Sequence, residues 1–214
     1  FKDRYLGTFG DLGAFSFHET KNFIGGQCGA LSINNPKFKK KATIILDKGT
    51  DRSLMGNKKK YYSWQGIGSE YRSTELSSAL LYGQLRNYKT IYDSRKIIWN
   101  EYFKNFSKLK SKKFSLLKSD NKLKKNAYHI FAFIFKNLKI RNKFISYMRK
   151  NNIECYFHYY PLHMSKFGKK YKKYNLTNTE KIYNGLVRLP LYPSLSKLEI
   201  KNIINATQKF LKRI

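Results

Sequence analysis

The sequence predicts an α/β fold, because strand-like and helix-like segments alternate along its whole length. The chain has 214 residues, enough to bury a substantial core as one large domain or two small ones. Hydrophobic residues make up 41% and aromatic residues 16%, which is typical of a globular rather than a disordered chain. No apolar run reaches the roughly 18 residues of a membrane helix, so no segment is expected to cross a membrane.

The first elements are expected to be two short strands, 12–17 and 28–34, with a polar loop between them. Asn35 and Pro36 are a typical helix cap and first-turn residue, and Gly49 is expected to end that helix. The next segment, 49–68, shows no period and carries three consecutive lysines. It is predicted to be a long exposed loop, a kind that is often functional.

A helix of roughly 30 residues is expected next, beginning with Ser73 as N-cap and reaching about Phe106. The remaining elements follow in order: strands 114–118, 129–135 and 153–159, a helix 141–150, and a last helix whose Ser196 and Glu199 have capping-box spacing. The break most typical of a domain boundary lies near the end of the long helix. We therefore expect one domain over 1–105, including that helix, and a smaller α/β domain over 106–214.

The net charge of +31 suggests a nucleic-acid-binding protein, because basic surfaces attract phosphate backbones. Two features argue against that interpretation. The chain has 35 Lys and only 9 Arg, whereas bidentate recognition of phosphates and bases prefers Arg. The 18 Asn and 7 Ala also indicate A/T-rich codons. Most of the charge is therefore assigned to genome composition. Cys28 and Cys155 form no CxxC pair, which favours a reduced, cytoplasmic setting.

Two motifs leave alternatives open. His158 and His163 frame the sequence HYYPLH, and they could bind a metal, line a pocket or simply pack; no nearby cysteine or carboxylate completes a metal set. The sequence GGQCG over 25–29 is similar to a phosphate-binding loop, but it lacks the Walker spacing and the following Lys-Ser/Thr pair. It predicts a tight turn that lets the backbone approach a flat group.

Lys21 lies between the first predicted strand and this glycine-rich turn. A lysine that attacks a carbonyl must be neutral part of the time, which requires lowering a pKa of about 10.4 by desolvation or nearby positive charge. Phe15, Phe17 and Phe23 would supply apolar surroundings, and Ser16 offers a hydroxyl for a phosphate. The pattern fits a lysine joined to a planar phosphorylated aldehyde, although most lysines are simply solvated.

Several motifs in order along nearly the whole chain resemble those of the DegT-type sugar-nucleotide aminotransferases, which are fold type I pyridoxal-phosphate enzymes. They are GTFGDLGAFSFHETKN, DKGTDRS, IGSEY, NAYHIF, HYYPLH and RLPLYPSLS. The sequence motifs SFHETKN and HYYPLH are most similar to those of the dTDP-4-amino-4,6-dideoxygalactose transaminases in this family. The resemblance implies the end of a large cofactor domain followed by a smaller C-terminal α/β domain.

The resemblance also implies roles for individual residues. Lys21 matches the lysine that forms the Schiff base with pyridoxal 5'-phosphate, and Ser16 matches the serine that contacts the cofactor phosphate. Glutamate would donate the amino group and a 4-keto-6-deoxy nucleotide sugar would receive it, for cell-surface polysaccharide synthesis. Lys21 would move the proton as a general acid/base, and it argues against the dehydrating branch, which carries His there. The family forms homodimers with shared active sites.

Three residues depart from the family pattern. Gln27 and Cys28 stand where the family commonly has Glu and Gly, and Glu70 stands where relatives have Asn or Ser near the neighbouring subunit's cofactor phosphate. A carboxylate there would repel a phosphate unless it is paired or points away. The aspartate that pairs with the pyridine nitrogen is expected upstream of this segment, so the chain is expected to be a fragment, incomplete for activity.

Three hypotheses follow from the sequence. The first is an aminotransferase for nucleotide sugars, with His158, His163 and Arg52 as candidate substrate contacts and no metal. The second is a catalytically silent or truncated homologue that acts only by associating with other proteins. The third is a basic nucleic-acid-binding module, which would show salt-sensitive affinity for DNA or RNA.

Overall fold

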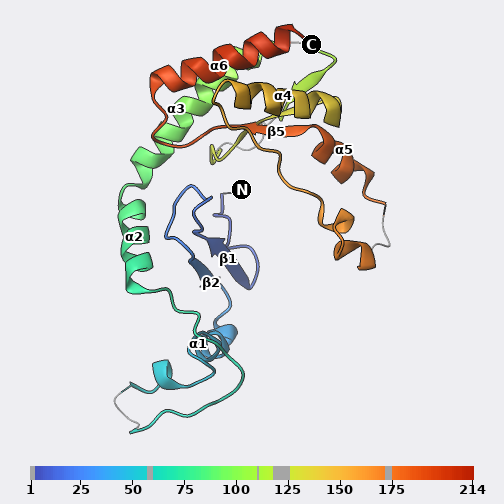
Figure 1. The fold of residues 1–214 in the computed structure, drawn as a ribbon. Coiled ribbons are helices and arrows are strands. Elements are labelled where there is room, and N and C mark those ends of the chain that lie inside the picture. Colours follow the sequence, from blue (N-terminus) through green and yellow to red (C-terminus); the bar gives the residue numbers. More distant parts are fainter. Residues whose placement is uncertain (1–2, 57–59, 110, 118–125, 172–174) are drawn as a thin grey trace. The chain divides into compact units, whose positions relative to one another are not determined.

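The computed structural model describes residues 3–56, 60–109, 111–117, 126–171 and 175–214 (Figure 1). These residues form two compact units, Phe1–Tyr88 and Lys89–Ile214, each of which mixes helices and strands. The α/β class expected from the sequence is therefore confirmed. Each unit is described by itself below.

The first unit contains one antiparallel strand pair and two helices. Strand β1 (Leu12–Ser16) pairs with β2 (Gly29–Ile33), and the register places Ser16 opposite Gly29. Both strands begin or end within two residues of the predicted ranges. The pair brings the two ends of the intervening loop together, so that the loop carrying Lys21 projects from one end of the ladder.

Helix α1 (Lys39–Leu46) follows a 3-10 turn over Pro36–Phe38. The Asn35 side chain accepts a hydrogen bond from the Lys37 amide at 3.2 Å, as predicted for a cap. The helix ends at Leu46, and Gly49 has a φ of +79°, a left-handed conformation in which glycine is least strained. Both the start of this helical segment at Asn35 and its end before Gly49 are thus determined by nearby residues.

The long loop 49–68 is largely irregular where it is described, as expected. It contains the 3-10 turn Arg52–Leu54 and is connected to neighbouring segments by isolated bridges between Thr50 and Trp64 and between Asp47 and Glu70. Two of the three consecutive lysines, at 58 and 59, lie outside the described residues.

The single long helix predicted from Ser73 to Phe106 is wrong. The chain forms two helices, α2 (Glu75–Arg86) and α3 (Tyr88–Phe106), with Asn87 between them. The Asn87 side chain donates to the Gly83 carbonyl at 2.9 Å, an alternative to helix continuation that asparagine offers readily. The N-cap is Thr74, whose side chain accepts from the Ser77 amide, and not Ser73. The two units meet in sequence at this break, while the domain limits 1–105 and 106–214 stay a prediction.

The second unit is built on a three-stranded antiparallel sheet in the order β3-β4-β5. Besides α3, which lies in this unit from Lys89 onward, its helices and strands are β3 (Phe114–Leu116), β4 (Phe131–Phe135), α4 (Leu138–Lys150), α5 (Thr177–Gly185), β5 (Leu186–Leu189) and α6 (Lys197–Lys212). Figure 1 shows α3, α4 and α6 gathered beside β5. Residue 118, the last of the predicted strand 114–118, lies outside the described residues.

The predicted strand 153–159 is wrong. Only Tyr156 in this segment pairs with the sheet, through one bridge to Arg188, whose amide donates to the Tyr156 carbonyl at 2.9 Å. The strand that completes the sheet is β5, a run of only four residues with Arg188 among three apolar ones, too short to give a clear strand pattern. Because β4 and β5 are far apart in sequence, their pairing depends on long-range packing and not on a local signal.

An aromatic cluster forms the core of this unit. Five phenylalanines from α3, α4 and β4 pack ring against ring and are almost fully buried: Phe106, Phe131, Phe133, Phe135 and Phe144. Burying each side chain stabilises the fold by about 1.5–3 kcal/mol relative to exposure. Helix α6 adds Phe210 to the cluster and begins with the predicted capping box of Ser196 and Glu199.

Candidate functional site

The Lys21 loop continues the ladder of the first strand pair. The Phe17 amide donates to the Cys28 carbonyl at 2.9 Å, and the Gly25 amide donates to the Phe17 carbonyl at 2.8 Å. These bonds close the base of the loop 18–24. Inside it, the Lys21 amide donates to the His18 carbonyl at 2.8 Å, so Lys21 ends a tight turn.

The Lys21 side chain is exposed. The apolar enclosure expected from Phe15, Phe17 and Phe23 is not formed by the described residues of this unit, because Phe15 is itself 41% exposed and the other two are only half-buried. The desolvation that we expected these phenylalanines to provide is therefore absent from this part of the chain. The role of Lys21 stays a prediction.

Ser16 and His18 border a shallow pocket of about 510 Å³ at the end of β1. The other lining residues come from the turn after the loop and from the segment before α2: Gln27, Cys28, Gly29, Glu70, Tyr71, Arg72 and Ser73. The Ser16 hydroxyl accepts a hydrogen bond from the His18 amide at 3.5 Å. All three positions that depart from the family pattern, Gln27, Cys28 and Glu70, thus lie on this pocket together with the candidate phosphate serine.

A compact ion-pair network holds the Glu70 side of this pocket. Lys48 forms an ion pair with Glu70, and Arg72 lies 3.3 Å from Asp47, which is only 2% exposed. The hydrogen bond to Lys48 lowers the pKa of the Glu70 carboxyl. The 2.6 Å hydrogen bond donated by Ser53 is the main cause that lowers the pKa of Asp47, with Arg72 contributing further. The carboxylates of Glu70 and Asp47 are thus paired with the cations of Lys48 and Arg72. Glu70 is therefore paired, as a carboxylate near a phosphate would have to be.

Sequence reasoning missed Lys48 and Arg72 as parts of this pocket and network. A signal was present, since Glu70 and Arg72 are two residues apart in an extended segment and therefore have side chains on the same side. The sequence does not indicate the partner of either residue, because Lys48 and Asp47 lie more than 20 residues earlier in the chain. Only the structure brings them together with Glu70 and Arg72.

Arg52 lies in the 3-10 turn of the long loop. Its guanidinium stands 5.8 Å from the centre of the Tyr62 ring, and its amide donates to the Thr50 hydroxyl at 3.4 Å. The structure describes these two contacts, and a contact of Arg52 with substrate stays a prediction.

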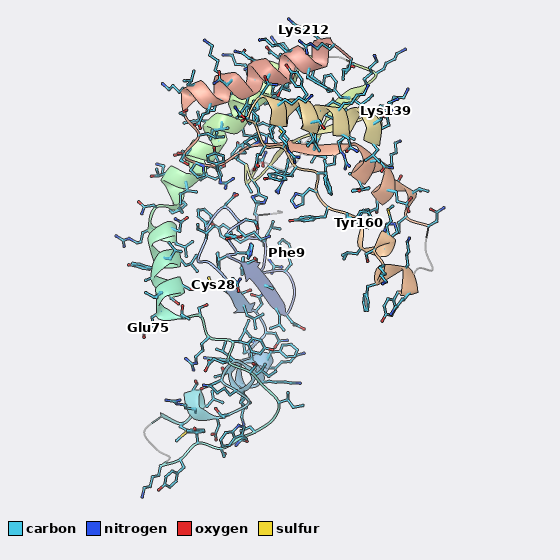
Figure 2. All side chains as sticks on the ribbon, viewed as in Figure 1. Phe9, Cys28, Glu75, Lys139, Tyr160 and Lys212 are labelled. Atoms are coloured by element: carbon cyan, nitrogen blue, oxygen red, sulfur yellow. The ribbon has the colours of Figure 1, made fainter. Side chains whose placement is uncertain are left out.

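His158 and His163 lie in the second unit and have different surroundings. His158 borders a pocket of about 520 Å³ with Tyr183, neighbouring residues and Tyr160, which is labelled in Figure 2. His163 Nε2 lies 3.0 Å from Glu180 Oε1, which links the HYYPLH segment to α5. His158 thus faces a pocket, whereas His163 is part of a polar pair; sequence reasoning missed Glu180 because it is 17 residues away.

Among residues 3–56, 60–109, 111–117, 126–171 and 175–214, no three His, Cys, Asp or Glu side chains lie closely enough together to hold a metal ion. None of the helices described is both long and apolar enough to cross a membrane.

The fold of this chain is similar to part of a solved aminotransferase structure. The structure superposes on Helicobacter pylori PseC, an aminotransferase involved in the biosynthesis of pseudoaminic acid, with a TM-score of 0.87. The match covers 100% of this chain and 57% of that one at 20% sequence identity. The chain belongs to the DegT/DnrJ/EryC1/StrS aminotransferase family, which it matches over residues 1–208. Members of this family are pyridoxal-phosphate enzymes.

Two curated relatives show how much of such a protein the chain spans. A Methanocaldococcus jannaschii protein, MJ1066, is 29% identical over 99% of this chain and 56% of its own length. The GDP-perosamine synthase of Escherichia coli O157:H7 is 24% identical over 98% of this chain and 54% of its own length. The chain therefore spans about half the length of the curated relatives it matches.

Proposed function

We propose that this chain is the lysine-bearing part of a pyridoxal-phosphate-dependent aminotransferase that converts a 4-keto-6-deoxy nucleotide sugar into an amino sugar, with glutamate as donor. The observation that carries the proposal is the family match over residues 1–208 together with Lys21 on a loop beside a pocket bordered by Ser16 and His18. The relatives support the substrate class, since one of them is a GDP-perosamine synthase.

The residues around this pocket fit a phosphate group. The Ser16 hydroxyl accepts from an amide and keeps its own proton to donate outward. Glycine at position 29, opposite Ser16, leaves that side of the ladder without a side chain. Glu70 would repel a phosphate dianion if it were free, but Lys48 pairs with it, and Arg72 brings a further cation to the pocket lining.

In this proposal Ser16 holds the cofactor phosphate and Lys21 is the residue to which the cofactor is attached. When bound, pyridoxal phosphate supplies an electron sink that stabilises negative charge on the substrate carbon. Lys21 Nζ would act as the general base that accepts the proton from the substrate carbon and, as an ammonium group, as the acid that returns it.

The remaining assignments extend the proposal. Arg52, His158 and His163 contact the nucleotide sugar, and the enzyme works in the cytoplasm as a homodimer with active sites shared between subunits. His158 is supported by its place on a pocket lined with tyrosines, which can stack on a sugar or base. His163 would act through its pairing with Glu180, which orients the imidazole.

The experiment that tests the function is amino transfer measured by mass spectrometry. The complete protein that contains this chain is incubated with pyridoxal phosphate, ¹⁵N-glutamate and a panel of 4-keto-6-deoxy sugars linked to dTDP, GDP or UDP. We expect one sugar to gain a ¹⁵N amino group, and Lys21→Ala to abolish the gain while Lys96→Ala, an exposed lysine on α3, leaves it unchanged. Transfer that survives Lys21→Ala would contradict the proposal, and so would the absence of transfer to every sugar.

A further inference from the structure

Arg141 lies on the buried face of α4 in the second unit. It is only 3% exposed, although arginine is almost never so deeply buried unless its charge is compensated. In the part of the chain that the structure describes, no carboxylate pairs with its guanidinium. The charge is therefore compensated by other groups, and these groups show what Arg141 holds in place.

Two aromatic rings pack against the guanidinium. Its central carbon lies 4.7 Å from the centre of the Phe157 ring and 5.1 Å from the centre of the Tyr183 ring. Both distances are shorter than the roughly 6 Å within which a cation is attracted to a ring face, and the attraction is stronger when the cation is desolvated. The two rings also contact each other edge to face, with their centres 5.8 Å apart. Arg141, Phe157 and Tyr183 therefore form one packed group, which we call the Arg141 cluster.

Hydrogen bonds fix the orientation of the guanidinium within this cluster. Nη1 donates to the Tyr183 carbonyl at 2.8 Å, and Nε and Nη2 donate to Oδ1 of Asn142 at 3.1 and 3.0 Å. These bonds leave from three different nitrogens of one plane, which is the fixed fork that only arginine provides. A lysine at position 141 would keep the positive charge but would lose both the fork and the flat face that packs on the rings.

The Arg141 cluster is joined directly to the pocket that His158 borders. Tyr183 lines this pocket of about 520 Å³, and Phe157 is the residue immediately before His158. Tyr160, another lining residue, packs edge to face on Tyr183 with the ring centres 5.6 Å apart. Arg141 is not itself a lining residue, so it acts on the pocket through the two rings that it holds.

The segment that carries His158 depends on this packing. An isolated bridge between Tyr156 and Arg188 ties the segment to the sheet. Phe157 is the only residue between that bridge and His158, and its ring packs on Arg141. Loss of the guanidinium would therefore release Phe157 and, with it, the position of the imidazole that follows.

We propose that Arg141 is a positioning residue: it holds Phe157 and Tyr183 so that His158 and Tyr160 stay on the pocket in the arrangement that binds substrate. The inference rests on the proposed function, in which His158 contacts the nucleotide sugar. Because Arg141 lies behind the pocket lining, it affects the binding of that substrate and not the proton transfer at the reacting carbon. A pocket whose binding arrangement is populated only part of the time binds more weakly in proportion to that fraction.

The first test is kinetic and uses the complete protein that contains this chain, with the nucleotide sugar that accepts the amino group. Arg141→Lys is expected to raise the KM for that sugar about tenfold, while kcat and the KM for glutamate change less than about twofold. Lys143→Met, which changes an exposed residue of the same helix, is the control and is expected to leave all three constants unchanged. A purely structural role would lower the amount of folded enzyme, and thus kcat, without raising one KM. An unchanged KM for the sugar in Arg141→Lys, or a loss confined to kcat, would overturn the inference.

A double variant tests whether Arg141 acts through Phe157. Phe157→Leu removes the ring at a position that is 42% exposed, so this variant is expected to fold. The KM for the sugar in Arg141→Lys/Phe157→Leu is expected to be no higher than in the worse of the two single variants, because residues that act as one unit are not additive. Effects on KM that multiply in the double variant would show two independent contributions and contradict the positioning role.

The position of His158 can also be followed without any activity. In the complete protein labelled with ¹⁵N-histidine, the imidazole signals of His158 and His163 are assigned from His158→Gln and His163→Gln. Arg141→Lys is expected to shift the His158 signals and to leave those of His163, which is held 3.0 Å from Glu180. Lys143→Met is expected to shift neither. His158 signals that do not move in Arg141→Lys would reject the inference.

The outcome is separable from that of the proposed function. Amino transfer that is lost in Lys21→Ala, together with an unchanged KM and unchanged His158 signals in Arg141→Lys, would keep the aminotransferase and reject the positioning role. His158 signals that depend on Arg141, in a protein that transfers no amino group to any sugar, would keep the positioning of His158 and reject the aminotransferase.

Discussion

The hydroxyl of Tyr102 provides a sharp test of how α3 is attached to the sheet of the second unit. Tyr102 is fully buried, and its hydroxyl donates to the Pro190 carbonyl, just beyond β5, at 2.8 Å. Burial raises the pKa of this phenol, so the group stays a neutral donor at all ordinary pH values. Tyr102→Phe keeps the ring contacts with Phe106 and Phe131 and removes only the hydroxyl.

The expected cost follows from the orphaned acceptor. Leaving a buried carbonyl without its donor costs about 1–3 kcal/mol. Unfolding entropy of about 2.1 cal/mol/K per residue gives roughly 0.27 kcal/mol/K for a unit the size of Lys89–Ile214. A loss of about 1–3 kcal/mol therefore lowers Tm by about 4–11 °C.

Differential scanning calorimetry of the whole chain measures this change. Tyr147→Phe is the control, since the contacts of Tyr147 in the described part of the chain are made by its ring, against Phe210, and by its backbone. We expect that control to melt within about 1 °C of the unaltered protein, because Tyr147→Phe keeps the ring contact with Phe210. A Tyr102→Phe variant that melts together with the control would refute the reasoning.

Three further predictions follow from local features. Ser196→Ala removes the cap of α6 and is expected to cost about 1 kcal/mol, measured as a lower urea midpoint with unchanged slope. Gly185→Ala places a methyl group against the backbone carbonyl of β4 and is expected to destabilise by about 2 kcal/mol or more, whereas Gly83→Ala, in open space within α2, is expected to stabilise by about 0.5–1 kcal/mol. Lys48→Met is expected to raise the pKa of Glu70 toward its ordinary value, followed by carbon NMR of the carboxyl. Since pairing lowers the folded-state pKa, its stabilising effect is present at neutral pH and is lost as the pH falls through that value; a Glu70 titration unchanged by Lys48→Met would contradict the ion pair.

The sequence predicted best the features that depend on neighbouring residues. The Asn35 cap and the Ser196–Glu199 capping box were confirmed, because a cap depends on side chains within three residues of the helix start. The strand pair around Lys21 was also confirmed, since its polar loop and glycines interrupt two clear strand patterns. Both kinds of signal are local.

Features that depend on distant parts of the chain were predicted poorly. The helix break at Asn87 was missed because the apolar spacing continues across it, and only the side-chain bond to Gly83 marks it. β5 was missed and 153–159 was taken for a strand because pairing with β4 is decided by packing. The places of Ser16 at the end of the first strand and of Lys21 in the following loop depend on neighbouring residues and were predicted. The Lys48–Glu70 ion pair joins residues that are distant in the chain and was not predicted.

The central claim is that Lys21 is the residue that carries the cofactor. The most direct measurement is reduction of the protein with borohydride in the presence of pyridoxal phosphate, followed by peptide mapping of the covalently attached group. The account predicts one major adduct, on Lys21, that is lost in Lys21→Ala and kept in Lys96→Ala. An adduct spread over many of the 35 lysines, or unchanged in Lys21→Ala, would contradict it and favour a catalytically silent homologue.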